Sequence, residues 1–118
     1  MTGIPESQPA AGNPRRFAFM LQLRPGAAEE YEAAHRAVWP EMLALLKSAG
    51  ISEYSIYRRD EILILALRTE DFEASWLKID NDPINLRWQA AMAPYFQPVQ
   101  GLRAGERFAM LEEVFYLP

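Results

Sequence analysis

The sequence has 118 residues, with 12 basic and 16 acidic side chains and a formal net charge of −4. This length suits a single domain. A net negative chain without a cluster of Lys and Arg does not attract phosphate backbones or anionic lipid, so we expect neither nucleic acid nor a membrane as a partner. The absence of cysteine excludes a disulfide framework, a thiolate metal site and a cysteine nucleophile.

The first stretch of the chain, 1–14, is rich in Pro, Gly, Ser and Ala. It has neither the basic start nor the continuous apolar stretch of a secretory signal. We therefore expect a disordered N-terminal arm over 1–14, followed by one domain over 15–118. Since no window of the sequence approaches the length of an apolar membrane span, we also expect a cytoplasmic protein.

Hydrophobic periodicity predicts the elements in the first half of the chain. Apolar side chains alternate over 16–23, which is typical of a strand. The pattern over 27–49 is helical, with acidic residues in its first turn and Gly50 after its end. Pro40 lies inside this pattern and has no backbone donor, so we expect a kink or a short break there.

The rest of the chain predicts, in order, strands over 53–58 and 62–68, helices over 71–79 and 83–92, a long loop over 93–108 and a strand over 109–116. A short polar turn between the first two of these strands favours a hairpin. The run 62–67 is apolar without alternation, which is typical of a strand covered on both faces. Asp82 and Pro83 suit the cap and the first position of a helix.

This order, β-α-β-β-α-β, predicts an α+β domain with the ferredoxin-like plan, in which helices cover one face of an antiparallel sheet. The opposite face of the sheet stays open in a monomer. We expect Phe17 or Phe19 on that open face, where an apolar patch usually marks a surface of association. Two such sheets facing one another would form a homodimer.

The only histidine, His35, is the strongest candidate for a catalytic residue. Tyr31, His35 and Trp39 have the spacing i, i+4, i+8, which places them on one face of a helix. This stripe has two interpretations. It can be amphipathic packing around a hydrogen-bonded histidine, or His35 can point into a pocket between helix and sheet, with Tyr31 and Trp39 as walls.

Further aromatic residues favour the pocket. Tyr54 and Tyr57 lie on a predicted strand, and Trp88 lies on the last predicted helix beside Gln89. Buried Trp and Tyr need partners for their polar ends. Aromatic faces suit the C–H faces of a sugar ring, and phenol and amide groups suit its hydroxyls, so we expect a small-molecule site of this kind.

Other chemistries have weaker support in the sequence. One histidine and scattered carboxylates do not give the ligand spacing of a metal site. The glycines of 101–105 do not lie between a strand and a helix, as a phosphate-binding loop requires. Glu112 and Glu113 are neighbours on a predicted strand and point to opposite faces, so they do not form a carboxylate pair. We expect neither a metal nor a cofactor.

Several stretches together have the form of a known family. The central one is the run Tyr-x-x-x-His-x-x-x-Trp-Pro-Glu over 31–41. The others are Phe17-Ala18-Phe19-Met20, Glu53-Tyr54-Ser55-Ile56-Tyr57, Arg87-Trp88 and the ending Glu113-Val114-Phe115-Tyr116-Leu117-Pro118. With these residues the chain resembles the L-rhamnose mutarotase family over about 16–118.

The resemblance implies a dimeric α+β barrel of two ferredoxin-like subunits and a cofactor-free isomerase that interconverts the anomers of a deoxysugar. It implies that His35 is the proton donor and that Tyr31, Tyr54 and Trp88 bind the sugar. The chain departs from the family pattern at two places. Gln89 follows Trp88 where the family commonly has a second tryptophan, and 94–98 replaces an Asn-Pro-Asp-rich segment. Both places bear on which deoxyhexose is bound.

The mechanism that we expect is general acid–base ring opening and closure. His35 would protonate the ring oxygen, and the base is left open between Tyr54, a carboxylate and water. Free imidazole titrates at about 6.5, which suits proton transfer at neutral pH. The alternatives on the same fold are a cofactor-free oxygenase, a haem-handling protein and a non-catalytic sugar-binding module, because a fold does not determine a function.

Overall fold

The computed structural model describes residues 15–118, so the arm predicted over 1–14 lies outside the described residues. The elements are β1 (Arg15–Leu23), α1 (Ala28–His35), α2 (Pro40–Ser48), β2 (Ser52–Arg59), β3 (Ile62–Thr69), α3 (Phe72–Asp80), α4 (Pro83–Met92), the 3₁₀ turn η1 (Ala93–Tyr95), β4 (Phe96–Gln97) and β5 (Ala109–Leu111). None of the helices in this part of the chain has the length and apolarity that crossing a bilayer requires.

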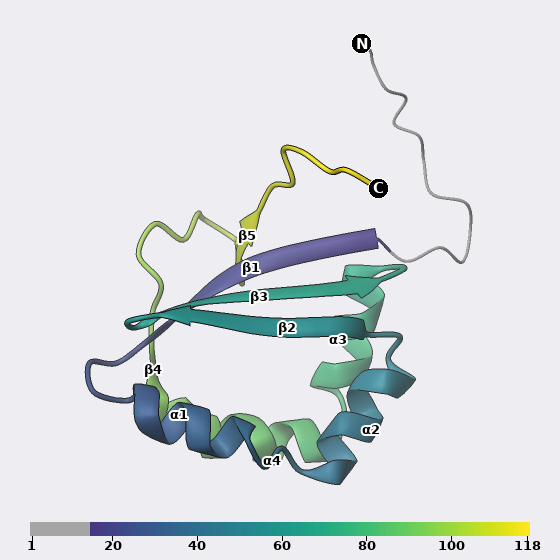
Figure 1. The fold of residues 1–118 in the computed structure, drawn as a ribbon. Coiled ribbons are helices and arrows are strands. Elements are labelled where there is room, and N and C mark those ends of the chain that lie inside the picture. The colour runs from purple at the N-terminus through teal and green to yellow at the C-terminus, as the bar shows by residue number, and fades with distance from the viewer. Residues whose placement is uncertain (1–14) are drawn as a thin grey trace.

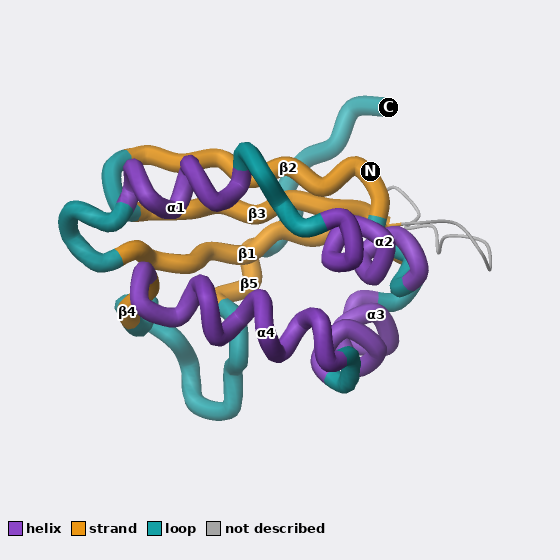
Figure 2. Tube along the Cα trace, turned by 90° about the horizontal axis from the view of Figure 1, so that it is seen from below, coloured by secondary structure: helices purple, strands orange, loops and turns teal. Residues whose placement is uncertain are grey.

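The strands form one antiparallel sheet in the order β2-β3-β1-β4, and β5 also pairs with β1. The sheet curves, and the four helices lie below it in Figure 1, all on its concave side. Figure 2 shows the same arrangement from the helix side. In this view α1 lies in front of β2 and β3, and α4 lies below β1. The predicted ferredoxin-like α+β plan is therefore confirmed.

The core lies between this concave face and the helices. Phe19 is 1% exposed and pairs with Leu65, so both side chains point toward the helices together with Leu63. The prediction that Phe17 or Phe19 lies on the open face is wrong. The alternation of β1 is as predicted, but its aromatic set faces inward, because the rings of Phe17 and Phe19 pack against Phe72 on α3.

Pro40 divides the predicted helix 27–49 into two. α1 ends at His35, and α2 begins at Pro40 itself. Trp39 has an extended backbone, with φ −58° and ψ 134°, as is usual for a residue before proline. The predicted stripe of Tyr31, His35 and Trp39 on one helix is therefore wrong at Trp39, which belongs to the connection between the helices.

The C-terminal strand is shorter than predicted, since only Ala109–Leu111 of 109–116 pairs with β1. The remaining tail leaves on the side of the sheet away from the helices (Figure 1). Arg16 contacts this tail through an ion pair with Glu113, at 2.6 Å, and through its guanidinium group, 3.3 Å from the ring centre of Tyr116. β5 ends at Leu111, which pairs with Ala18, although β1 extends three residues further to Arg15.

Candidate functional site

A cavity of about 120 Å³ lies between the concave face of the sheet and helices α1 and α4. A second, more apolar cavity of about 410 Å³ adjoins it toward α2. His35, Tyr54, Trp88 and Gln89 line both. The first cavity is also lined by Phe19, Leu21, Tyr31, Ile56, Leu65, Trp76, Asp80, Asn85, Met92, Phe96, Arg107 and Phe108.

His35 is the last residue of α1 and is half-buried. Its Nδ1 lies 2.9 Å from the backbone carbonyl oxygen of Tyr31, one helical turn earlier. A carbonyl oxygen can only accept, so Nδ1 carries the hydrogen and donates it. This bond leaves Nε2 as the ring nitrogen that can exchange a proton with a ligand in the cavity.

Aromatic rings surround this imidazole. The Tyr31 ring lies 4.1 Å from it, centre to centre, and Trp88 meets it edge-on at 5.4 Å. Trp39 packs edge-on against Trp88 at 5.0 Å, and in the described part of the chain it lines neither cavity. The structure therefore brings Tyr31, His35 and Trp88 together, with Trp39 behind Trp88.

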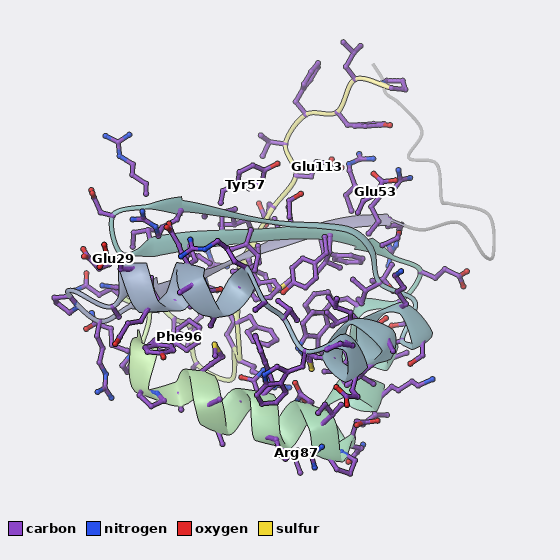
Figure 3. All side chains as sticks on the ribbon, turned by 60° about the horizontal axis from the view of Figure 1, so that its bottom comes forward. Glu29, Glu53, Tyr57, Arg87, Phe96 and Glu113 are labelled. Carbon is purple, nitrogen blue, oxygen red and sulfur yellow. The ribbon has the colours of Figure 1, made fainter. Side chains whose placement is uncertain are left out.

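The two tyrosines suggested by the second predicted strand lie on opposite faces of the sheet. Tyr54 lies on the helix side and lines the cavity, whereas Tyr57 is 61% exposed on the open side. Figure 3 shows Tyr57 above the sheet and Phe96 on the helix side. Since successive side chains of β2 alternate except at the irregularity before Ser55, Tyr57 cannot reach the cavity.

Burial changes the acidity of both tyrosines in the site. It raises the pKa of Tyr31, which is 4% exposed, to about 12. Burial also raises the pKa of Tyr54 well above its ordinary value, and the neighbouring Tyr31 adds to this rise. Both phenols are therefore neutral at physiological pH and have an O–H group that can donate a hydrogen bond.

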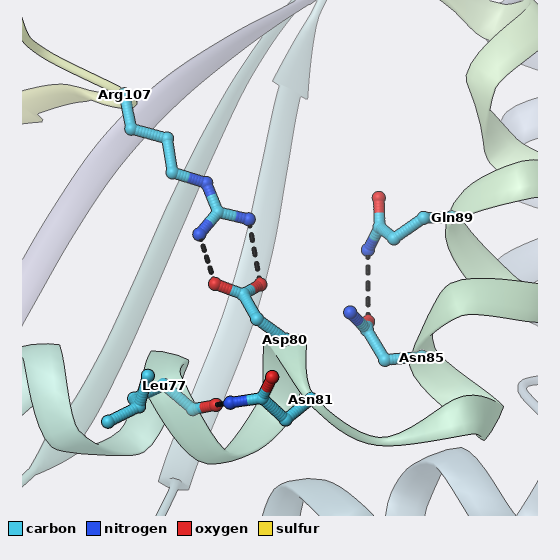
Figure 4. A network of polar contacts seen from close by, with 6 residues as sticks. All are labelled: Leu77, Asp80, Asn81, Asn85, Gln89 and Arg107. Carbon is cyan, nitrogen blue, oxygen red and sulfur yellow. Dashed lines mark hydrogen bonds and ion pairs between the residues drawn. The ribbon is translucent and has the colours of Figure 1, made fainter.

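A polar wall completes the cavity. Arg107, in the segment before β5, forms a two-pronged ion pair with Asp80 at the end of α3, and one of its bonds, Nη2 to Oδ1, measures 2.8 Å (Figure 4). This hydrogen bonding with Asp80 raises the pKa of Arg107. On α4, the Gln89 amide donates to Asn85 Oδ1 at 3.2 Å. Within residues 15–118, no group of three metal-ligating side chains lies close enough together to hold an ion.

Asp80, Asn85 and Arg107 line the cavity but were not predicted from the sequence. Asn85 could have been predicted, because Asn85 precedes Trp88 and Gln89 by about one helical turn and therefore shares their face of the helix. Asp80 and Arg107 are 27 residues apart, on a helix and in a loop. Neither helical nor strand periodicity can predict a contact between residues on two different elements.

Solved structures resemble this arrangement. The chain matches L-rhamnose mutarotase from Formosa agariphila with a TM-score of 0.71 and 29% identity, over 88% of this chain and 99% of that one. It also matches tetracenomycin F2 cyclase from Streptomyces glaucescens with a TM-score of 0.66, over 88% and 97% of the two chains. The latter is 15% identical, so it supports the fold alone.

Sequence comparison identifies the family. The chain is 43% identical over 81 residues to L-rhamnose mutarotase of Sinorhizobium fredii, covering 66% of this chain and 76% of that protein. It is 34% identical over 110 residues to the L-rhamnose mutarotase of Shigella flexneri, covering 87% and 98%. A family model for L-rhamnose mutarotase matches residues 16–117. The chain therefore belongs to the L-rhamnose mutarotase family.

Proposed function

We propose that this protein interconverts the α and β anomers of L-rhamnose or a closely related deoxyhexose. The observation that carries the proposal is the imidazole of His35, which has one ring nitrogen tied to the backbone and lines a cavity with tyrosine hydroxyls and aromatic faces. Relatives named for activity on L-rhamnose support the choice of sugar.

The reaction needs one acid and one base. Nε2–H of His35 donates its proton to the ring oxygen while a base removes the proton of the anomeric hydroxyl, and the bond between C1 and the ring oxygen breaks. The open-chain aldehyde rotates about its C1–C2 bond. The hydroxyl then attacks the other face of the aldehyde and returns its proton to His35, while the protonated base gives its proton back to the carbonyl oxygen, which becomes the hydroxyl of the other anomer.

The other side chains bind and orient the sugar. The phenols of Tyr31 and Tyr54 donate hydrogen bonds to its hydroxyls, since both stay neutral. The ring of Trp88, supported by Trp39, packs on a C–H face of the sugar, and the amide of Gln89 meets a further hydroxyl. Because a neutral phenol is a poor base, the base is water or a carboxylate.

Exchange NMR tests the proposal. Saturation of one anomer signal transfers to the other when the protein speeds their exchange, and we expect this with L-rhamnose at a rate above that of buffer. Fucose, galactose and xylose complete the panel. Binding of a sugar without faster exchange would identify a non-catalytic binding module, and a Soret band after haem titration would identify a haem-handling protein.

We also infer that the protein works as a homodimer built on the open face of the sheet. Met20, Ile62 and Ile64 lie half-buried on this face, on the side of the sheet away from the helices. On the same side, Val114 and Phe115 of the tail are 90% and 78% exposed. A second copy would bury both apolar surfaces.

A further inference from the structure

The ion pair between Asp80 and Arg107 has an unusual position for a surface pair. Both residues line the cavity that contains His35, whose other walls are mainly aromatic and aliphatic. They also line a larger, open hollow of about 660 Å³ on the outside of the molecule, together with Trp76 and Phe108. The pair therefore stands between the cavity and this outer hollow.

Arg107 is held in this place by the segment that carries it. The carboxylate of Glu106 accepts hydrogen bonds from the backbone N–H groups of Arg103, at 2.9 Å, and Met110, at 3.2 Å. The Arg107 guanidinium also lies over the Phe108 ring, 4.7 Å from its centre. Strand β5 starts directly afterward and pairs with β1. The guanidinium thus approaches Asp80 from a segment that is fixed on both sides.

The pair lies on a different side of the cavity from the histidine. In the view of Figure 2, α1, which ends at His35, and the segment 98–108 lie on either side of α4. Figure 4 shows Asp80 and Arg107 on one side, and Asn85 and Gln89 of α4 on the other. A sugar with its anomeric centre at His35 would have its far edge on the side of the charged pair.

We propose that the Asp80–Arg107 pair determines which sugar the site accepts, by hydrogen bonding to neighbouring hydroxyls on the ring edge away from the anomeric centre. The carboxylate oxygens have lone pairs beyond those that Arg107 uses, and the guanidinium has N–H groups beyond those that Asp80 uses. Together they can accept from one hydroxyl and donate to the next. A change in the orientation of either hydroxyl loses a charge-assisted bond. This inference rests on the proposed sugar site.

Two variants of the pair test the proposal. Asp80→Asn keeps the shape of the side chain and removes its charge, and Arg107→Met keeps an unbranched apolar stem. For L-rhamnose we expect KM to rise by about ten- to a hundredfold, the range for a hydrogen bond to a charged group, with kcat within about threefold. The ratio of kcat/KM between L-rhamnose and each other sugar of the panel should fall by about tenfold.

The matched control is the ion pair of Arg58 and Glu32, which joins β2 to α1 and lines neither cavity. Arg58→Met and Glu32→Gln should leave KM and the sugar preference unchanged. Circular dichroism melting checks that each variant folds. If Arg107→Met does not fold, Arg107→Lys keeps the charge and still removes the two-pronged geometry.

The outcomes separate this inference from the proposed function. Unchanged preference among the sugars in folded Asp80 and Arg107 variants would overturn the inference and leave the mutarotase proposal intact. A loss of kcat at constant KM in Asp80→Asn would also overturn it, because the carboxylate would then be the base. If the unaltered protein exchanges no sugar, tryptophan fluorescence still measures sugar affinity. Weaker and less selective binding in the variants would then support the inference while the proposed activity fails.

Discussion

Nδ1 of His35 lies 2.9 Å from the carbonyl oxygen of Tyr31, so the backbone of the same helix selects the tautomer of the only histidine. The partner that orients the ring is thus a backbone carbonyl and not a carboxylate, and Nε2 stays available for proton transfer. It also requires the last turn of α1, because donor and acceptor are four residues apart. The end of the helix at His35 is therefore part of the site.

Replacing His35 by Asn tests the acid. Asn can keep a polar contact with the Tyr31 carbonyl but cannot transfer a proton at neutral pH. We expect the kcat for anomer exchange to fall by about 10²- to 10⁴-fold, measured by saturation-transfer NMR. Glu30→Gln, an exposed change on the same helix, is the control and should keep full activity. Unaltered exchange in folded His35→Asn would remove His35 from the mechanism.

Tyr31→Phe tests the effect of burial on the phenol. In the unfolded chain this phenol loses its proton around pH 10, but in the folded protein its pKa is about 12. The unfolded state thus binds fewer protons in this interval, so the stability that the neutral phenol contributes is complete below pH 10 and is lost as the pH rises toward 12. Between pH 10 and 12 the free energy of unfolding should therefore fall in both proteins, but by about 2 to 3 kcal/mol less in Tyr31→Phe than in the unaltered protein.

Urea unfolding at several alkaline pH values measures this difference. Tyr57→Phe removes a phenol from the exposed face of the sheet and is the matched control. Parallel curves for Tyr31→Phe and the unaltered protein would show that Tyr31 is not buried as a neutral group.

Gln89→Trp tests the position that departs from the family pattern. An indole there removes the hydrogen bond to Asn85 and fills part of both cavities that Gln89 lines. We expect the preference among L-rhamnose, fucose, galactose and xylose to change by about tenfold, as one pocket contact can provide. Leu86→Trp, on the exposed side of α4, should leave it unchanged. No shift with Gln89→Trp would place this side chain outside the sugar site.

A buried hydroxyl network predicts a stability effect away from the site. Ser75 Oγ donates to the Ala49 carbonyl at 2.7 Å, so Thr69 donates to Ser75 across their 2.6 Å contact. Ser75→Ala leaves both partners unsatisfied and should lower the free energy of unfolding by about 1 to 3 kcal/mol. Chemical denaturation measures it, with the exposed change Ser55→Ala as control. Equal stability of the two variants would contradict the network.

The proposed dimer has its own test. Ile64→Lys places a charge on the open face of the sheet, and a buried charge without a partner is costly, so we expect a shift from dimer to monomer in light scattering after size exclusion. Leu86→Lys, on the exposed side of α4, should keep the mass of the unaltered protein. A monomeric mass for the unaltered protein would refute the proposal directly.

Local patterns in the sequence were sufficient for the elements and for part of the site. Alternation predicted β1, the missing donor of Pro40 predicted the break before α2, and Asp82 caps α4 by accepting from Ile84 at 2.9 Å. The spacing of Tyr31 and His35 predicted their contact, because residues four apart meet on any helix. Each of these features depends on neighbours along the chain.

The tertiary structure decided what depends on distant segments. Alternation divides β1 into two faces but does not say which one meets the helices, so only packing with Phe72 places Phe19 inside. The approach of Arg107 to Asp80, which completes the polar wall, depends on how β5 returns to β1 beside α3. Periodicity describes one element at a time, whereas these contacts join elements that only the fold brings together.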